Sequence, residues 1–358
     1  MKNKVLTGLL LVLIGGWGSL SAQSAGSNYS RQVNTLIGTK GVGLTSGYLY
    51  PGATYPYGMV QFTPSYFSKR SGFVINQLSG GGCEHMGNFP TFPVKGKLKM
   101  SPDNILNYRI NISEEKGHAG YYEAMVQEDI KAKLTVTERT GMASYEYPAD
   151  QQYGTVIIGG GISATPIEQA AIVITAPNKC EGYAEGGNFC GLRTPYKVYF
   201  VAEFDTDALE SGTWKRNELK PNTTFAEGEY SGVYFTFDVN KKKNIQYKIG
   251  VSYVSVENAR ENLKAENTGW DFLQIQNQAE SKWNHYLGKI EVEGTNPDRT
   301  TQFYTHLYRS FIHPNVCSDV NGEYMGADFK VHKSRSKHYT SFSNWDTYRT
   351  QIQLLSIL

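Results

Sequence analysis

Apolar and polar residues alternate with a period of two through much of the chain between residues 31 and 256. The alternation is clearest at residues 131–137, 197–204, 233–239 and 246–256, and clusters of Gly, Asn, Asp and Pro separate these runs. Such alternation predicts β-strands that bury one face. No helical pattern of convincing length interrupts the strands, so this part of the sequence predicts a large antiparallel β-sandwich.

The period becomes helical after Ser255, which precedes a stretch rich in Ala, Leu and Glu. A second helix is expected from about Trp270 to Leu287, and a third after the turn at residues 294–298. Their expected inward faces repeat every three or four residues and consist of Phe272, Ile275, Ala279, Trp283 and Tyr286 in the second helix and Phe303, Leu307, Ser310 and Phe311 in the third. Helices are then expected to dominate as far as Leu358. The predicted fold class is therefore a multidomain protein of β plus α type.

Residues 1–25 have the composition of a secretory signal peptide. Lys2 and Lys4 precede an apolar stretch at residues 5–20, and small residues follow it. No later segment approaches the roughly 18 apolar residues that a membrane-spanning helix requires. We therefore expect a secreted or periplasmic protein, with a sandwich domain at residues 28–256, a helical linker at 257–297 and the start of a helical domain at 298–358.

The last residues form an apolar run with no Gly, Pro or cap after it, made of Ile352, Leu354, Leu355, Ile357 and Leu358. A helix that ends in this way lacks the usual stop signals. We therefore expect the chain to be the front portion of a longer protein, whose remaining residues cover this apolar end.

Charge gives little indication of a partner, because 35 basic and 33 acidic residues leave a formal net charge of +2. A field this weak does not gather phosphates, so nucleic acid is not an expected partner. The only basic cluster, Lys241, Lys242 and Lys243, is expected in a solvated hairpin turn between two strands.

The four cysteines, Cys83, Cys180, Cys190 and Cys317, allow three pairings. Cys180 and Cys190 bracket a Gly-rich segment, and a local disulfide between them is one expectation for a secreted protein. Cys83 and Cys317 are then expected to stay free, with Cys317 buried as a small hydrophobic residue. The spacing does not fit a CxxC zinc or redox site.

Candidate chemistry is densest at residues 304–330 and 339–349, which are rich in Trp, Asp, Arg, His and Asn. Aromatic faces, carboxylates and guanidinium groups are what a sugar pocket requires. Trp345 and Asp346 are the leading substrate-binding candidates, the ring as the floor of the pocket and the carboxylate as an acceptor from two hydroxyls. Arg349 follows by about one helical turn and is placed to brace Asp346.

Glycoside hydrolysis requires two carboxyl groups across the sugar, and the sequence gives no distances with which to choose them. Asp319, Glu323, Asp328 and Asp346 all lie in the dense region. Asp319 and Glu323 also fit loop residues that form Asx turns. None of the seven histidines belongs to an HExxH arrangement. No metal-ligand set is therefore assigned within this chain.

Two Gly-rich segments are further candidates for a binding loop. In the first, Gly38, Gly41 and Gly43 lack the Lys-Ser/Thr of a phosphate-binding loop, which favours structural turns. Tyr50 and Gly52 lie in the same segment, where a glycine would let the backbone approach a ligand.

The second Gly-rich segment, residues 78–93, carries Cys83, Glu84 and His85. Nucleophilic Cys–His chemistry needs converging side chains and a third orienting group, which a pair two residues apart rarely provides. A sugar-contacting loop is the preferred interpretation.

Six ordered blocks of sequence resemble those of glycoside hydrolase family 92, the calcium-dependent exo-acting α-mannosidases. They are VNTLIGT, YPGATYPYGMVQFTP, LSGGGC, SYVSVENARENL, FYTHLYRSFIHPNVCSDVNGEYMG and YTSFSNWDTYRTQ. The resemblance extends from Arg31 to Leu358 and covers the N-terminal half of a typical member. It implies a β-sandwich, a two-helix linker and the first helices of a six-hairpin (α/α) barrel.

The resemblance also implies an inverting mechanism, with a Glu as general acid, an Asp as general base and a calcium ion that binds mannose hydroxyls. The catalytic carboxylates and calcium ligands are expected beyond Leu358, so no catalytic residue is assigned here and the fragment alone is expected to be inactive. Trp345 and Asp346 match residues that hold the terminal mannose. Loops matching Tyr50–Gly52 and Gly80–His85 contribute to the pocket.

The expected substrates are α-mannoside glycans, such as N-glycans or mannans. Leu44 stands where many members carry a His, and no Trp precedes the LSG strand. These departures argue against α-1,2 specificity and leave other α-mannosidic linkages or a mannosyl phosphodiester open. An alternative is a carbohydrate-binding β-sandwich protein without catalysis.

Overall fold

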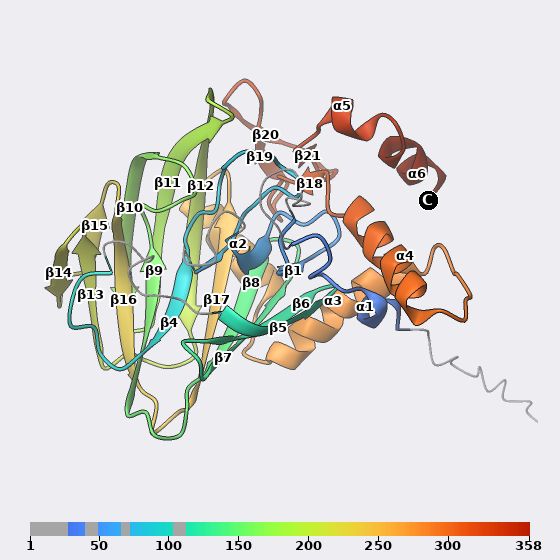
Figure 1. The fold of residues 1–358 in the computed structure, drawn as a ribbon. Coiled ribbons are helices and arrows are strands. Elements are labelled where there is room, and N and C mark those ends of the chain that lie inside the picture. Colours follow the sequence, from blue (N-terminus) through green and yellow to red (C-terminus); the bar gives the residue numbers. More distant parts are fainter. Residues whose placement is uncertain (1–27, 40–48, 66–71, 103–111) are drawn as a thin grey trace, which may run out of the picture.

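The computed structural model describes residues 28–39, 49–65, 72–102 and 112–358. The expected signal peptide at residues 1–25 lies outside the described residues, as do Gly41, Gly43 and Leu44. Figure 1 shows two layers of strands, with most of the helices gathered on one side of them.

Two large sheets form the sandwich, and every strand pairing in them is antiparallel. The eight-stranded sheet has the spatial order β1 (Ala53–Thr54), β2 (Gln61–Pro64), β3 (Phe73–Val74), β4 (Thr91–Lys95), β9 (Tyr153–Gly159), β16 (Ser231–Asp238), β13 (Glu210–Lys215), β14 (Glu218–Pro221). The nine-stranded sheet has the order β15 (Phe225–Glu227), β10 (Ile167–Ala176), β11 (Lys179–Phe189), β12 (Leu192–Phe204), β17 (Asn244–Ser252), β8 (Thr140–Glu146), β7 (Ile130–Val136), β6 (Tyr121–Val126), β5 (Ile112–His118).

Aromatic side chains from both sheets fill the space between them. The ring centroids of Phe204 and Phe235 lie 4.9 Å apart, and those of Phe62 and Tyr247 lie 6.4 Å apart. Strand β6 shows the strict alternation of buried and partly buried residues that the sequence pattern predicts. The predicted antiparallel β-sandwich is thus confirmed, and each of the four clearest alternating runs coincides with a strand.

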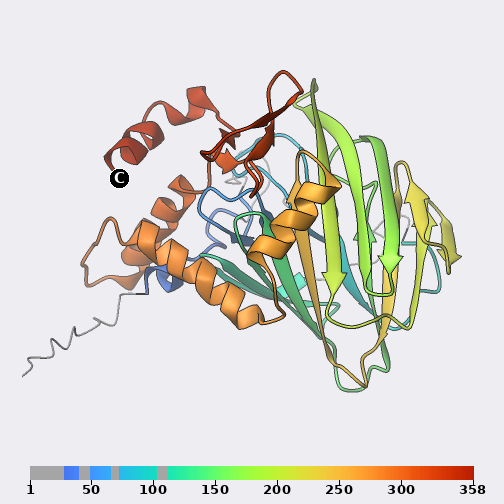
Figure 2. The same ribbon diagram turned by 180° about the vertical axis from the view of Figure 1, so that it is seen from behind.

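Three helices follow the sandwich, as the change of period predicts. They are α2 (Val256–Glu266), α3 (Phe272–Leu287) and α4 (Pro297–Ser310). Ser255 caps α2 by accepting a hydrogen bond from the Asn258 N–H (3.1 Å), and Asn296 caps α4, in which Pro297 occupies the first turn. Figure 2 shows α2 and α3 lying across the outer side of the nine-stranded sheet, where α2 contacts β17 and β12.

A second hydrophobic cluster joins the helices to the start of the chain. It contains Trp283, Leu307, Tyr308 and Phe311 from the helical part and Val33 and Tyr50 from the segments that precede the sandwich strands. The short α1 (Tyr29–Gln32) packs against α3 and α4. Part of the expected inward faces therefore lies in a core that the two parts of the chain share: Trp283, Leu307 and Phe311 are buried in it, and Tyr286 and Phe303 pack against it. Ile275 and Ala279 are buried outside this cluster, and Phe272 and Ser310 are only half-buried.

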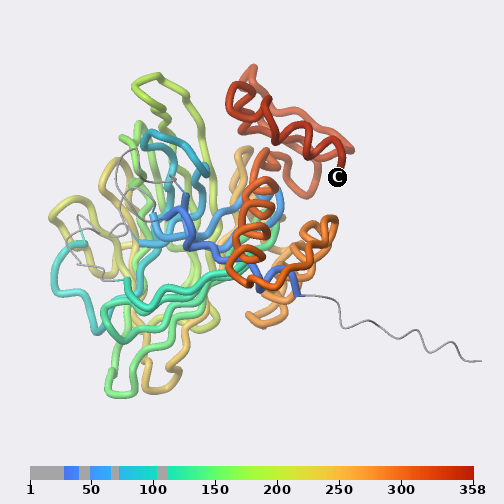
Figure 3. The backbone as a smooth tube through the Cα atoms, turned by 45° about the vertical axis from the view of Figure 1, so that its right-hand side comes forward, coloured from blue at the N-terminus to red at the C-terminus, as the bar shows by residue number. Residues whose placement is uncertain are grey.

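The expectation that helices dominate after residue 310 is wrong for residues 315–340. This segment forms two small antiparallel sheets, β18 (Asn315–Val316) with β21 (Tyr339–Thr340), and β19 (Glu323–Met325) with β20 (Val331–Lys333). Helices return as α5 (Asn344–Thr347) and α6 (Gln351–Ile357), grouped with α4 at one side of the sandwich (Figure 3). Gly322 and Gly326 interrupt the helical period here, which explains the error.

The Lys241–Lys243 cluster also differs from expectation, because β16 and β17 belong to different sheets and are not a hairpin. The segment crosses from one layer of the sandwich to the other. Lys241 and Lys243 are exposed, while Lys242 Nζ lies 2.7 Å from a carboxylate oxygen of Asp205. The prediction that this cluster is exposed to solvent is therefore confirmed for Lys241 and Lys243, and the prediction that it forms a hairpin turn is wrong.

Candidate functional site

A cleft of about 830 Å³ lies between the sandwich and the segment that follows α4. Most of its lining comes from three places, the loop at residues 78–86, the β11–β12 hairpin and residues 315–342, and Met59, Gln61 and Tyr253 complete it. The two small C-terminal sheets stand beside the ends of β11 and β12 (Figure 1). A concave space of this size, between parts of a chain, is the usual setting of a ligand site.

The lining of the cleft combines apolar surface with a few polar groups. Met59, Met86 and Met325 line it together with the aromatic side chains of Tyr196, Tyr253, Tyr339 and Phe342, and its polar members include Glu185, Lys197 and Asn315. The Lys197 ammonium lies 3.4 Å from Glu185 and 4.1 Å from the centroid of the Tyr183 ring. Aromatic faces beside paired polar groups suit the C–H and O–H surfaces of a sugar.

The loop at residues 78–86 is joined covalently to the tip of the β11–β12 hairpin. Cys83 and Cys190 form a disulfide, while Cys180 and Cys317 are free and buried. The expected Cys180–Cys190 pair is therefore wrong, as is a free Cys83. Cys180 and Cys190 mark the two ends of strand β11, and about ten residues at roughly 3.3 Å each place them far beyond disulfide reach. Cys317 is buried as predicted.

His85 and Glu84 sit differently within this loop. His85 is buried against the ring of Phe189, with ring centroids 5.7 Å apart, whereas Glu84 is exposed. Burial lowers the pKa of His85 to about 4, which keeps its imidazole neutral near pH 7. A Cβ on Gly81 would stand 2.6 Å from His85 Nε2, so only glycine allows the loop to fold over this ring. The sulfur of Cys83 is part of the disulfide, so Cys83 has no free thiol that could contact a ligand.

Tyr50 and Gly52 lie in the interior of the protein. Tyr50 is fully buried in the cluster shared by the helices and the first segments, and its backbone carbonyl accepts a hydrogen bond from Arg309 Nη1 (3.1 Å). A Cβ on Gly52 would lie 2.2 Å from the Cβ of Thr63. The close approach that requires glycine is thus made to β2, and the Tyr50 side chain presents no surface to a sugar.

Trp345, Asp346 and Arg349 lie together near the C-terminal end, outside the cleft lining. Trp345 is 79% exposed on α5, three residues after the cleft residue Phe342. The Asp346 carboxylate accepts a hydrogen bond from the Ser343 hydroxyl. Arg349 Nε donates to the Tyr348 hydroxyl (2.9 Å), and its guanidinium lies over that ring. Ser343, rather than Arg349, therefore contacts Asp346.

Asp319 is a buried anchor between the sandwich, α2 and the C-terminal segment. Its carboxylate accepts hydrogen bonds from Ser252 Oγ (2.6 Å), Asn258 Nδ2 (2.8 Å) and Asn262 Nδ2 (2.6 Å). Burial raises its pKa, and these three hydrogen bonds act in the opposite direction. Glu323 interacts with the same Asn258 and, at 3.6 Å, with Lys333. Both carboxylates are structural. The sequence could not identify their partners in β17 and α2, which lie between 57 and 67 residues away.

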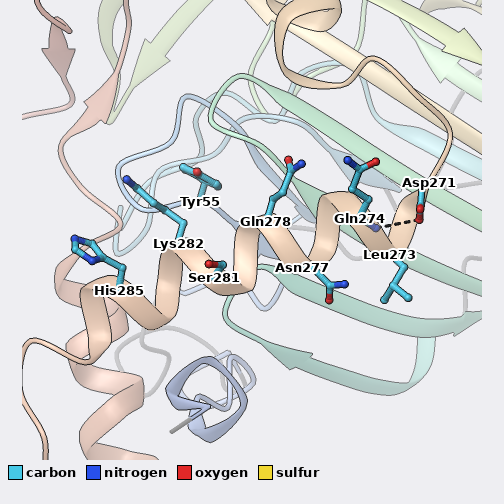
Figure 4. A pocket seen from close by; sticks show the side chains of 9 residues that line it. All are labelled: Tyr55, Asp271, Leu273, Gln274, Asn277, Gln278, Ser281, Lys282 and His285. Atoms are coloured by element: carbon cyan, nitrogen blue, oxygen red, sulfur yellow. Dashed lines mark hydrogen bonds between the residues drawn. The ribbon is translucent and has the colours of Figure 1, made fainter. Parts of the chain in front are cut away.

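A second hollow runs along the outward side of α3, and it is shallow and polar. Figure 4 shows its side chains spaced along the helix, with Asp271 accepting the Gln274 N–H at the helix start (3.0 Å). The lining is Tyr55, Asp271, Leu273, Gln274, Asn277, Gln278, Ser281, Lys282 and His285. Apart from Tyr55, which lies between β1 and β2, these residues belong to α3 and its N-cap and are those expected on the solvated face of an amphipathic helix.

Two sequence models of known protein domains match this chain, one on each side of the cleft. The sequence model of the glycosyl hydrolase family 92 N-terminal domain matches residues 32–252, and that of the family 92 catalytic domain matches residues 258–358. The chain belongs to glycosyl hydrolase family 92. In family 92 terms, the sandwich and the β11–β12 hairpin belong to the N-terminal domain, and residues 315–342 belong to the catalytic domain. The cleft therefore lies where the two domains meet.

Three relatives illustrate the likeness. An uncharacterized secreted glycosidase of Arthroderma benhamiae is 26% identical over 90% of this chain and 45% of its own length. A family 92 α-mannosidase structure from Bacteroides thetaiotaomicron is 25% identical, with a TM-score of 0.81 over 92% of this chain and 47% of that one. An inverting family 92 mannosidase of the same organism is 23% identical and shares the fold, with a TM-score of 0.74 over 92% of this chain and 46% of its own. The chain thus spans about half the length of these family 92 relatives.

Two further observations concern the described part of this family 92 chain. Within it, no three His, Cys, Asp or Glu side chains lie close enough together to hold a metal ion. Across the same residues, no helix is both long and apolar enough to cross a membrane.

Proposed function

We propose that the protein is a secreted, inverting exo-α-mannosidase that releases mannose from α-mannoside glycans such as N-glycans or mannans. The observation that carries the proposal is the cleft between two matched family 92 domains, lined by aromatic and polar side chains. The mannosidase structures among the relatives support mannose as the sugar, and the inverting relative supports the stereochemistry.

The proposed division of labour follows the chain. Residues 28–256 form the sandwich wall of the cleft, residues 257–297 the linker and residues 298–358 the first part of the catalytic domain. The signal peptide at residues 1–25 directs secretion, in keeping with the secreted glycosidase among the relatives. The general acid, the general base and the calcium ligands belong to the part of a family 92 enzyme that this chain does not cover.

Trp345 and Asp346 are the proposed holders of the terminal mannose. Both side chains are exposed, so neither is committed to the core of the described structure. Among the described residues, the side-chain partner of the Asp346 carboxylate is the rotatable hydroxyl of Ser343, and a sugar hydroxyl can take the place of that hydroxyl. Glu84 is the proposed contact from the sandwich side, because it is exposed beside the cleft loop.

The test uses protein that contains this chain together with the rest of the family's length, incubated with a panel of α-mannosides. Proton NMR follows the released sugar. Mannose that appears first as the β-anomer supports an inverting exo-mannosidase and shows which linkage is cut. Saturable binding without release would instead support a carbohydrate-binding protein without catalysis.

Asp346→Ala in the same protein is expected to lower kcat/KM by at least about 100-fold, because two charge-assisted hydrogen bonds at about 1.5–3 kcal/mol each are lost. The fold should be unchanged, since the residue is exposed. Asp298→Ala removes an exposed carboxylate far from this segment and serves as the control. Turnover near that of the parent protein would remove Asp346 from the pocket.

A further inference from the structure

The rim of the cleft is built from two segments whose residues are mostly exposed or half-buried, with His85 packed against Phe189 where the segments meet. We call residues 78–86 the rim loop and residues 188–197 the hairpin tip. Every residue from Cys190 to Pro195 is exposed. In the rim loop, a Cβ added to Gly80 or Gly82 would meet nothing within 4 Å. Weakly packed segments of this kind move unless something else holds them.

The Cys83–Cys190 disulfide holds these two segments to each other. The two sulfurs are 107 residues apart in the sequence, so the bond fixes a separation that the chain itself does not. Both segments carry cleft residues close to the bond: Leu78 and Met86 on the two sides of Cys83 in the rim loop, and Thr194, Pro195, Tyr196 and Lys197 after Cys190 in the hairpin tip.

A second attachment ties the rim loop to the catalytic domain. The Ser79 N–H donates to His313 Nε2 (2.9 Å), and the other ring nitrogen of His313 faces Asn315 Oδ1 (2.8 Å). Because Nε2 accepts, the proton sits on Nδ1 and is donated to Asn315. Asn315 lines the cleft and in turn donates to the Gly58 carbonyl (2.8 Å).

We infer that the rim loop is a brace, with Cys83 and His313 as positioning residues that fix the opening of the cleft for substrates longer than one sugar. The loop is attached at one end to the hairpin of the sandwich and at the other to the catalytic domain. A glycan that contacts both walls needs them at a fixed distance, since ordering them on binding would cost affinity. A single mannose needs only its own subsite. This inference rests on the proposed function for its substrate class.

The test compares kcat/KM for two substrates, using protein that contains this chain together with the rest of the length typical of family 92. Cys83→Ala/Cys190→Ala is expected to lower kcat/KM for a mannose-terminated oligosaccharide about tenfold, a change equivalent to about 1.4 kcal/mol. The loss should appear mainly in KM. With an aryl α-mannoside, which presents one sugar, the expected loss is below about twofold.

Cys180→Ala is the matched control, because it removes a cysteine from the sandwich core without touching the rim. It should lower the melting temperature yet leave the ratio of the two kcat/KM values unchanged. Equal losses on both substrates in the disulfide variant, or no loss on either, would overturn the inference. If that variant fails to fold, the parent protein in dithiothreitol replaces it, since the dithiol reduces the disulfide to two thiols and is itself oxidised to a cyclic disulfide.

Hydrogen exchange separates the brace from the proposed activity. Cutting the disulfide should speed exchange in the rim loop, in the hairpin tip and also at residues 313–317, which the brace reaches through His313. Faster exchange confined to the two cysteine segments would refute the brace. A parent protein that cleaves no mannoside would refute the proposed function alone, because the exchange measurement requires no substrate.

Discussion

Asp319→Ala tests whether one buried carboxylate fastens the catalytic-domain segment to the sandwich. Asp319 is 2% exposed, and its backbone N–H also donates to the Glu323 carbonyl (2.8 Å). Its side chain joins β17, through Ser252, to two asparagines on α2. The alanine variant removes all three side-chain hydrogen bonds and leaves the backbone arrangement in place.

The expected loss in unfolding free energy depends on which other acceptors the donors to Asp319 still have in the alanine variant. Asn262 Nδ2 also donates to the Val251 carbonyl (2.8 Å), and Asn258 Nδ2 also reaches Glu323 (3.1 Å). Neither amide is therefore left wholly without an acceptor. A hydrogen bond to a charged carboxylate contributes about 1.5–3 kcal/mol, but removing Asp319 also removes the cost of burying its charge, so each lost hydrogen bond should cost about 1 kcal/mol net. The expected loss is about 3 kcal/mol.

Urea unfolding monitored by tryptophan fluorescence and far-UV circular dichroism measures this loss, since Trp214 lies in the sandwich and Trp283 in the helical part. Two probes are needed because a protein of two parts can unfold in steps. Asp328→Ala is the control: this carboxylate lies on the same segment, is half exposed and contacts His332. It should change the free energy of unfolding much less than Asp319→Ala does, because an exposed ion pair contributes little to stability.

A loss below about 1 kcal/mol for Asp319→Ala, or one no larger than that of Asp328→Ala, would refute this account of the anchor. Its pH dependence gives a second check. Burial raises the pKa of Asp319, so the folded protein binds this proton more tightly than the unfolded chain. By linkage, this group lowers stability as the pH rises from about 3.9 towards the raised pKa, with no further change above it. Asp319→Asn should abolish that component.

Two other measurements bear on the site. His85 and His313 have pKa values lowered by burial from 6.5 to about 4, so stability should fall as the pH drops from 6.5 towards 4, by up to about 3 kcal/mol for each group. His313→Gln, which keeps an acceptor for Ser79 but does not titrate, should reduce that slope in urea unfolding at stepped pH; an unchanged slope would contradict the assignment. Chelation with EDTA should silence mannose release by the protein containing the full family length, and added calcium should restore it, whereas activity that withstands the chelator would argue against a calcium requirement.

Local patterns in the sequence were sufficient to predict the strands and the first helices. Period-two alternation located β7 and β16, and Ser255 marked the start of α2 because its side chain satisfies a helix N–H. Each of these elements is decided by residues within a few positions of one another. The same local patterns failed at residues 315–340, where β18 pairs with β21, more than 20 residues further along the chain.

The candidate site was predicted less completely because its parts come together only in three dimensions. The Gly-rich loop was expected at the pocket, and Leu78 and Met86 do line the cleft. Its partner across the disulfide could not be chosen, since three pairings were compatible with the sequence. Tyr50 illustrates the opposite problem: an aromatic residue beside Pro and Gly suggested a ligand loop, and burial in a shared core explains it instead.

The polar contacts between the two domains explain how the cleft keeps a defined shape. Arg309 of α4 donates to the carbonyls of Tyr50 (3.1 Å) and Thr35 (2.7 Å), and the Trp283 indole donates to the Thr54 carbonyl (2.7 Å). Apolar packing alone would tolerate small slides of α3 and α4 over the sandwich, because it has no direction. Hydrogen bonds to fixed backbone carbonyls do not tolerate such slides without leaving buried groups unpaired. The helices are therefore held in one register on the sandwich, and residues 315–342, which follow α4 and line the cleft, begin from that fixed position.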